Sequence, residues 1–147
     1  MFSHPIRVYW EDTDAGGVVY HAQYLAFLER ARSEWMRALG WDQDAMRRGR
    51  DQERMRREHD LVFAVRAMQV DFRAPARLDD DLVATAVLRE CRNASLVFAQ
   101  DVRRGDDLLL SATVRIAVLA ASTFRPRPIP ESLLRELTAL QDIQQHA

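Results

Sequence analysis

Lysine is absent from this chain of 147 residues, in which all 21 basic residues are arginine. Arginine gathered at one site would indicate planar recognition of phosphate or carboxylate. Here the bias runs through every region, which favours codon usage in a GC-rich genome as its cause. Cysteine occurs once, as Cys91. A disulfide within the chain and a thiolate metal cluster are therefore excluded, and we expect Cys91 to be a small buried apolar side chain.

The sequence also lacks a long hydrophobic run and an excess of charge of one sign. No stretch approaches 18 uninterrupted apolar residues, and the N-terminus has no apolar segment typical of a signal peptide. The net charge is -1, which argues against a dedicated nucleic-acid binder. With no linker or repeat, we predict a single domain over residues 1–147, located in the cytoplasm, without stable membrane insertion.

Residues 22–39 have the clearest helical pattern. Their apolar members recur at three- and four-residue intervals, which predicts an amphipathic helix; they are Tyr24, Phe27, Leu28, Ala31, Trp35 and Leu39. Gly40 is a typical stop signal, and Arg30 and Glu34 have the spacing of an ion pair on the helix surface. Because the apolar stripe is wide and aromatic, we expect this helix to form the centre of the core.

Strand patterns surround this helix. Residues 7–10 predict a short first strand, and residues 61–72, 82–88, 95–102 and 108–121 predict four more. In the longest run we expect one face to carry Val62, Ala64, Met68, Val70 and Phe72. Short connections make neighbouring strands antiparallel, and a C-terminal helix opens near Glu131. These elements predict an α+β domain in which one helix covers only part of a five-strand sheet, so we expect self-association.

Residues 11–21, EDTDAGGVVYH, carry the chemistry. An acidic pair and a glycine pair stand directly before the long helix. Free N–H groups at a helix start can hold a polarised oxygen, and glycine permits close approach of a ligand. A carboxylate beside them could act as a base or nucleophile in acyl transfer. Acidic turns before helices are also common as simple caps, so both interpretations stay open on the residues alone.

Four blocks carry a resemblance to a known family. They are residues 8–24 (VYWEDTDAGGVVYHAQY) continuing through 27–32 (FLERAR), residues 72–80 (FRAPARLDD), residues 94–98 (ASLVF) and residues 125–130 (RPRPIP). Together they resemble the hotdog-fold acyl-CoA thioesterases, in particular the YbgC branch associated with the Tol-Pal system, within the 4-hydroxybenzoyl-CoA thioesterase family. The resemblance implies a hotdog fold: a five-strand antiparallel sheet wrapped around one long central helix, here with a short C-terminal helix.

The resemblance also implies roles for residues near the helix start. Asp14 matches the catalytic carboxylate, which attacks the thioester carbonyl or activates a water molecule. The N–H of His21 matches the group that polarises this carbonyl, while its side chain either assists the reaction or orders the loop. Gly17 lets the substrate approach, and Tyr20 and Tyr24 are pocket walls or core residues. The hypothesis requires Asp14 to face a space large enough for a thioester.

Coenzyme A would bring phosphates, for which arginine is suited. Candidate ligands in loops and the tail are Arg92, Ser95, Arg125 and Arg127. In this family the site usually lies between subunits, so these ligands can come from the partner of a homodimer or homotetramer. We expect no cofactor beyond the coenzyme A of the substrate, and no metal, because the histidines lack metal-ligand spacing.

Three functions compete. The first is hydrolysis of acyl-CoA, or of acyl groups on acyl carrier protein. The second is a non-catalytic module that binds the same molecules, since a fold does not fix a function. The third is an interaction protein that uses the arginine-rich residues 47–57, which we interpret more simply as a surface helix.

Overall fold

The protein is described here by a computed structural model, which covers residues 2–38, 56 and 60–146. Its strands are β1 (Phe2–Arg7), β2 (Leu61–Phe72), β3 (Asp81–Arg92), β4 (Ser95–Arg104) and β5 (Asp107–Ala120). Its helices are the 3-10 turn η1 (Trp10–Asp12), α1 (Gln23–Arg37) and α4 (Glu131–His146). Gly40 and the predicted surface helix at residues 47–57 lie outside the described residues, except for Arg56.

The five strands form one antiparallel sheet in the order β1-β3-β4-β5-β2. Tight turns join β3 to β4 and β4 to β5, as the short connections predicted. Gly105 in the second turn has φ +59°, a conformation that glycine adopts without strain. The α+β arrangement predicted from the sequence is confirmed.

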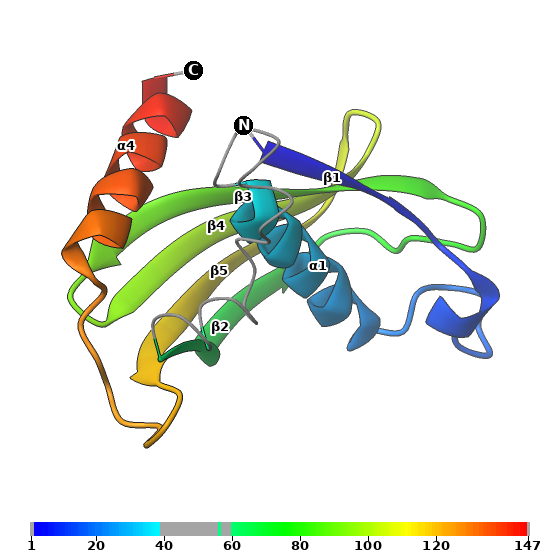
Figure 1. Ribbon diagram of the computed structural model, residues 1–147. Helices are drawn as coiled ribbons and strands as arrows, with labels where there is room; N and C mark the ends of the chain where they lie inside the picture. Colours follow the sequence, from blue (N-terminus) through cyan, green and yellow to red (C-terminus); the bar gives the residue numbers. More distant parts are fainter. Residues whose placement is uncertain (1, 39–55, 57–59, 147) are drawn as a thin grey trace.

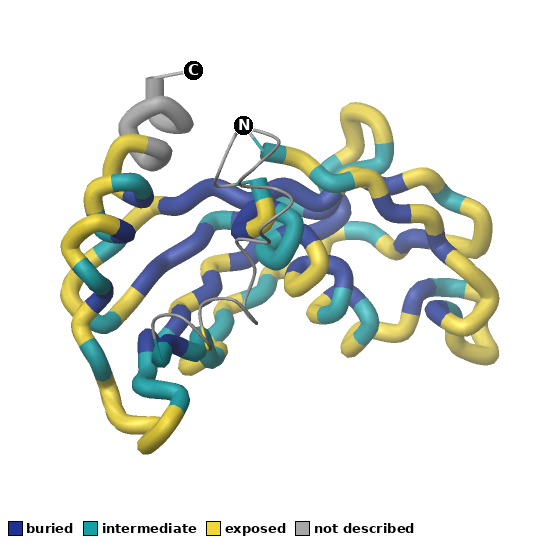
Figure 2. Tube along the Cα trace, in the orientation of Figure 1, coloured by how far each residue is buried: buried dark blue, intermediate teal, exposed yellow. Residues whose placement is uncertain are grey.

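Helix α1 lies across the sheet and fills the centre of the core (Figure 1). Its buried side chains are Tyr24, Phe27, Leu28, Ala31, Trp35 and Met36. The buried stretches of the sheet lie behind it (Figure 2), and the edge of the Trp35 ring packs on Phe98 of β4. On the exposed side of α1, Glu34 pairs with Arg37 at 2.7 Å, whereas Arg30 lies over the ring of Phe27. The predicted pair of Arg30 with Glu34 is therefore wrong.

The prediction that Val62, Ala64, Met68, Val70 and Phe72 share one face of β2 is wrong, because the strand contains a β-bulge. The register of β2 against β5 shifts between Val65 and Ala67, and an extra residue reverses the alternation of side chains. Phe63 and Val65 face a cavity beside α1, while Phe72, after the bulge, contacts Tyr24 of α1. Odd-numbered residues therefore face the helix before the bulge and even-numbered residues face it afterwards.

Both ends of the chain also differ from the prediction. The first strand ends at Arg7, because the Asp12 carboxylate accepts the Tyr9 N–H at 2.9 Å and the chain turns into η1. Trp10 is consequently 79% exposed. The C-terminal helix α4 is not short: it has 16 residues, and Leu133 and Leu137 join the same core as α1. None of the helices in the described part of the chain has the length and apolar character that a membrane span requires.

Candidate active site

The residues between β1 and α1 form a small hairpin that begins at Asp14. Thr13 and Val19 form a β-bridge, and the Asp14 N–H donates to the Val18 carbonyl at 2.9 Å. The Gly17 N–H donates back to the Asp14 carbonyl at 3.0 Å. Gly17 has φ +78°, so a side chain at this position would strain the turn. The glycine pair predicted to shape this segment thus closes a tight turn around Asp14.

The Asp14 side chain is exposed and belongs to the first residue of the turn that the Gly17 N–H closes. Its Oδ1 accepts the Gly16 N–H at 2.8 Å, and a Cβ on Gly16 would stand 3.2 Å from that same oxygen. No described residue contributes a hydrogen bond to Oδ2. Asp14 does not line the cavity described below. Among the described residues, therefore, Asp14 has one carboxylate oxygen without a hydrogen-bond partner, and its side chain lies outside the cavity beside α1.

The start of α1 lies directly after the hairpin. The Gln23 N–H donates to the Tyr20 carbonyl at 2.8 Å, which carries the chain into the helix. No described residue accepts the His21 N–H, which lies two residues before α1 begins. The rings of Tyr20 and His21 are 4.4 Å apart and both residues are exposed. The segment between the hairpin and α1 therefore presents one backbone N–H without a partner, that of His21, and the two exposed rings of Tyr20 and His21.

Tyr24 has a different position from Tyr20. It is 4% exposed, and its hydroxyl accepts the Ala76 N–H at 2.9 Å. Ala76 in turn accepts the Val19 N–H at 2.8 Å through its carbonyl. Tyr24 is therefore a core residue rather than a pocket wall. Its hydrogen bond joins α1 to the segment around Ala76, which in turn holds the hairpin.

The segment around Ala76 is itself held by an ion pair. The Asp80 carboxylate accepts the Arg77 N–H at 2.8 Å and a guanidinium N–H of Arg104 at 2.7 Å. Burial alone would raise the pKa of Asp80, but these two donors and the neighbouring positive charges hold its pKa below the usual value. The segment that holds the hairpin is therefore itself fixed by a charge-assisted hydrogen bond between Arg104 and Asp80.

The candidate phosphate ligands lie together at the other end of the sheet. The turn that contains Arg92 and Ser95 is joined to the tail by a hydrogen bond from the Ile129 N–H to the Asn93 carbonyl, and to β5 by one from the Val118 N–H to the Ala94 carbonyl. The tail carries Arg125, which is exposed, and Arg127, whose guanidinium lies 3.5 Å from the Asp60 carboxylate. Strand β4 has ten residues and spans about 33 Å. One chain thus brings these four residues together but not to Asp14.

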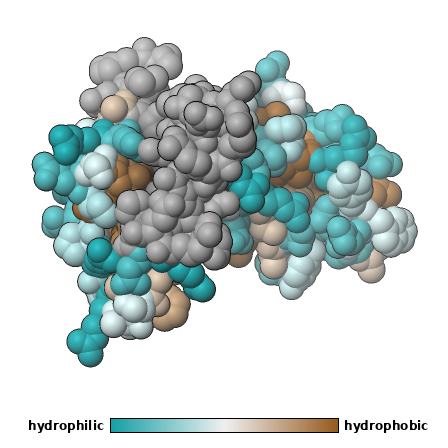
Figure 3. All heavy atoms as spheres, in the orientation of Figure 1, coloured by the Kyte–Doolittle hydropathy of each residue, from teal (hydrophilic) through white to brown (hydrophobic). Residues whose placement is uncertain are grey.

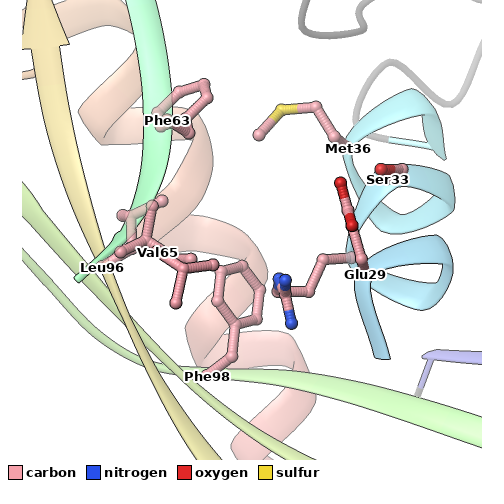
Figure 4. A pocket seen from close by; sticks show the side chains of 9 residues that line it. Glu29, Ser33, Met36, Phe63, Val65, Leu96 and Phe98 are labelled. Atoms are coloured by element: carbon pink, nitrogen blue, oxygen red, sulfur yellow. The ribbon is translucent and has the colours of Figure 1, made fainter. Parts of the chain in front are cut away.

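A cavity of about 180 Å³ lies between α1 and the sheet (Figure 4). Its helix wall carries Glu29, Arg32, Ser33 and Met36, and its sheet wall carries Phe63, Val65, Leu96, Phe98 and Ile116. The wall is polar on the helix side and mostly apolar on the sheet side.

The residues that hold the polar wall were not predicted from the sequence. Arg32 donates to the Gln100 side chain at 2.8 Å, and the Gln100 amide donates to the carbonyls of Leu28 and Thr85. Gln100 is 1% exposed. Burial lowers the pKa of Arg32, and the nearby charge of Glu29 partly offsets this. A signal existed, because Gln100 occupies an inward position of β4 between Phe98 and Val102.

Cys91, near the end of β3, is partly exposed, which corrects the expectation that it is buried. Burial raises the pKa of its thiol to about 11, so it is a poor nucleophile at neutral pH. The described residues contain no group of three or more His, Cys, Asp or Glu side chains that could hold a metal ion.

Comparisons with known proteins agree over most of the chain. The model of the thioesterase superfamily matches residues 16–111, beginning two residues after Asp14. The acyl-CoA thioester hydrolase YbgC of Escherichia coli O6:H1 is 42% identical over 137 residues, which cover 92% of this chain and 95% of that protein. The acyl-CoA thioesterase YbgC of Haemophilus influenzae is 39% identical, with 90% of each chain covered.

A solved structure gives the same result. The probable thioesterase from Bartonella henselae superposes with a TM-score of 0.71 at 34% identity, covering 87% of this chain and 96% of that one. This similarity over most of both chains, together with the match to the thioesterase superfamily, confirms the predicted hotdog fold.

Proposed function

Since this chain belongs to the thioesterase superfamily, we propose that it hydrolyses the thioester of acyl-CoA with Asp14 as the catalytic carboxylate. The observation that carries the proposal is the 42% identity to an acyl-CoA thioester hydrolase over 92% of the chain. The open Oδ2 of Asp14 and the open N–H of His21 support it, because the reaction needs an acid and an amide donor at the same carbonyl.

Two routes fit these groups. As nucleophile, Asp14 attacks the thioester carbon and expels the coenzyme A thiolate, which takes a proton from water. Water then hydrolyses the acyl-aspartyl anhydride and restores the carboxylate. As general base, Asp14 takes a proton from water while that water attacks the carbon; the C–S bond then breaks, and the coenzyme A thiolate takes up that proton, which restores the Asp14 carboxylate. In both routes the His21 N–H holds the carbonyl oxygen as negative charge develops on it.

The acyl group has a candidate recess in the cavity beside α1. Glu29 lies six residues after Gln23, which is about 9 Å along the helix axis. An acyl chain whose thioester sits at the helix start must extend at least this far to reach the cavity of the same chain. The apolar sheet wall favours an acyl tail over a charged group.

We infer that a second copy of the chain completes the site. Asp14 and the arginine group lie at opposite ends of the sheet, and large apolar side chains are exposed near the hairpin: Tyr9, Trp10, Tyr20, Leu25 and Phe72. Hydrophobic residues also reach the surface beside the hydrophilic ones in Figure 3. Exposed apolar area of this kind is typical of an interface, and a two-fold dimer can bring unlike ends of two chains together.

Mixed dimers test this arrangement. Chains with Asp14→Asn are reassociated with chains that carry Arg92→Ala and Arg125→Ala, each of which is expected to be nearly inactive alone. If each site uses both chains, a mixed dimer has one intact site and activity returns. If dimers shown to be mixed recover no activity, the shared site is refuted: either Asp14 and the two arginines serve the same site within one chain, or the arginines serve no site.

The catalytic assignment is tested by thiol release from a panel of acyl-CoA and acyl-carrier-protein substrates. Asp14→Asn is expected to lower kcat by about 100-fold or more while coenzyme A still binds. Asp106→Asn, in another exposed glycine turn, is the matched control and should keep wild-type activity. Full activity of Asp14→Asn would refute the catalytic role, and loss of stability alone would support the cap interpretation.

The alternative is a module that binds acyl-CoA without cleaving it. It predicts saturable binding and no free thiol from the wild-type protein. The acyl-carrier-protein substrate, the Tol-Pal association and the cytoplasmic location stay predictions.

A further inference from the structure

Asp12 is a buried carboxylate to which the reaction assigns no role. It is 2% exposed, and both of its carboxylate oxygens are engaged. Oδ2 accepts the Tyr9 N–H at 2.9 Å, and Oδ1 accepts a side-chain N–H of Gln23 at 2.8 Å. A buried polar side chain costs free energy unless it is hydrogen-bonded, and each oxygen of Asp12 has a donor. The side chain thus joins two separate segments, around Tyr9 and at the start of α1.

The contacts of Asp12 close the Asp14 hairpin from both sides. Through its carbonyl, Asp12 also accepts the Tyr20 N–H at 3.0 Å. One residue thus binds Tyr9 at the start of η1, the residue before His21, and the first residue of α1. Asp14 leaves this point along the hairpin and His21 returns to it, so the distance between the two candidate catalytic groups depends on Asp12.

We propose that Asp12 and Gln23 form a positioning pair that sets the register of Asp14 against the His21 N–H. The inference rests on the proposed function, since it concerns the same two groups. The pair touches no substrate in this arrangement: Asp12 is buried behind the hairpin, and the Gln23 amide is committed to it. Because reacting groups must be held to within a fraction of an ångström, a displacement of about 1 Å can cost about 100-fold in rate.

The test exchanges the charge of the pair. Gln23→Glu places a second carboxylate against Asp12 and should lower kcat by about 10- to 100-fold, with KM nearly unchanged. Asp12→Asn alone should cost little, because the oxygen of the introduced amide accepts the Tyr9 N–H and the Gln23 amide can turn to accept from its nitrogen. In the double variant Asp12→Asn/Gln23→Glu, the introduced amide keeps the Tyr9 N–H and donates to the introduced carboxylate, so kcat should return to within a few-fold of wild type.

Controls separate positioning from other effects. Gln69→Glu makes the same substitution at an exposed position of β2 and should leave kcat near the wild-type value. All variants are compared as folded protein, by far-UV circular dichroism and thermal unfolding. A kcat that follows folded fraction alone, or a double variant no better than Gln23→Glu, overturns the positioning role.

The same assay separates failure of the proposed function from failure of the positioning pair. If the wild type releases no thiol, or Asp14→Asn keeps wild-type kcat, the proposed function fails and the inference fails with it. If the wild type is active and Asp14→Asn is not, but the double variant shows no recovery, only the positioning pair is overturned.

Discussion

Replacing Gln100 by leucine tests how α1 is fixed to the sheet. The Gln100 amide donates to the carbonyls of Leu28 and Thr85 at 3.0 and 3.1 Å, and its oxygen accepts from Arg32 at 2.8 Å. Leucine has a similar size but makes none of these bonds. The change therefore removes hydrogen bonds with little change in packing volume.

The magnitude follows from the three bonds. Each neutral bond contributes about 1 kcal/mol, and the bond to the charged guanidinium contributes about 1.5–3 kcal/mol. Arg32 is partly exposed and can recover some hydration, while the leucine gains apolar burial of about 1 kcal/mol. We expect a net loss of about 2–3 kcal/mol in the free energy of unfolding, and a fall in Tm of about 5–10 °C.

The assay is urea unfolding followed by circular dichroism, with thermal unfolding as a second measure. Gln69→Leu, at an exposed position of β2, is the matched control and should change the free energy by less than about 0.5 kcal/mol. A double-mutant cycle with Arg32→Leu isolates the charged bond, and the combined loss should fall short of the sum by about 1 kcal/mol or more. A Gln100→Leu protein as stable as the Gln69→Leu control would refute the reasoning.

Three further predictions concern the cavity, the cysteine and the support of the hairpin. Ser33→Phe reduces the volume of the cavity and should lower kcat/KM for decanoyl-CoA far more than for acetyl-CoA in the thiol-release assay. Arg37→Phe, outside the cavity, should affect both substrates equally. If Ser33→Phe also affects both equally, the cavity does not bind the acyl chain. Because the pKa of Cys91 is about 11, its alkylation by iodoacetamide at pH 8 should be about 100-fold slower than in urea, and equal rates would contradict this. Asp80, whose pKa is lowered by Arg104 among other groups, stabilises the fold above its unfolded pKa of about 3.9 and loses this effect as the pH falls through its folded pKa. The Tm difference between wild type and Asp80→Asn should therefore be largest near pH 7 and shrink below about pH 4; a pH-independent difference would argue against the ion pair.

Local sequence was sufficient for the main elements. The three- and four-residue spacing of apolar side chains predicted α1 to within two residues at either end of the described part. The turns at Asn93 and Gly105, both with positive φ, were visible as polar residues between apolar runs. These features depend on neighbouring residues alone, so the sequence contains the information directly.

Other features depend on residues far apart in the chain. The bulge in β2 is defined by its pairing with β5, and the sequence of β2 alone does not predict the extra residue. Trp10 was predicted to extend the first strand, but Asp12 takes the Tyr9 N–H and ends it. The burial of Gln100 makes sense only once α1 supplies Arg32 from 68 residues away.

The candidate site divides in the same way. The sequence by itself determined that an acid, two glycines and a helix start follow one another in residues 14–23, because their order along the chain brings them close. Only the tertiary structure decided that Asp12 is the buried member of the acidic pair, and that the candidate phosphate ligands gather at the far end of the sheet. The physical reason is that hydrogen-bond partners and burial are set by which strands and helices pack together, and that packing joins segments that the sequence keeps apart.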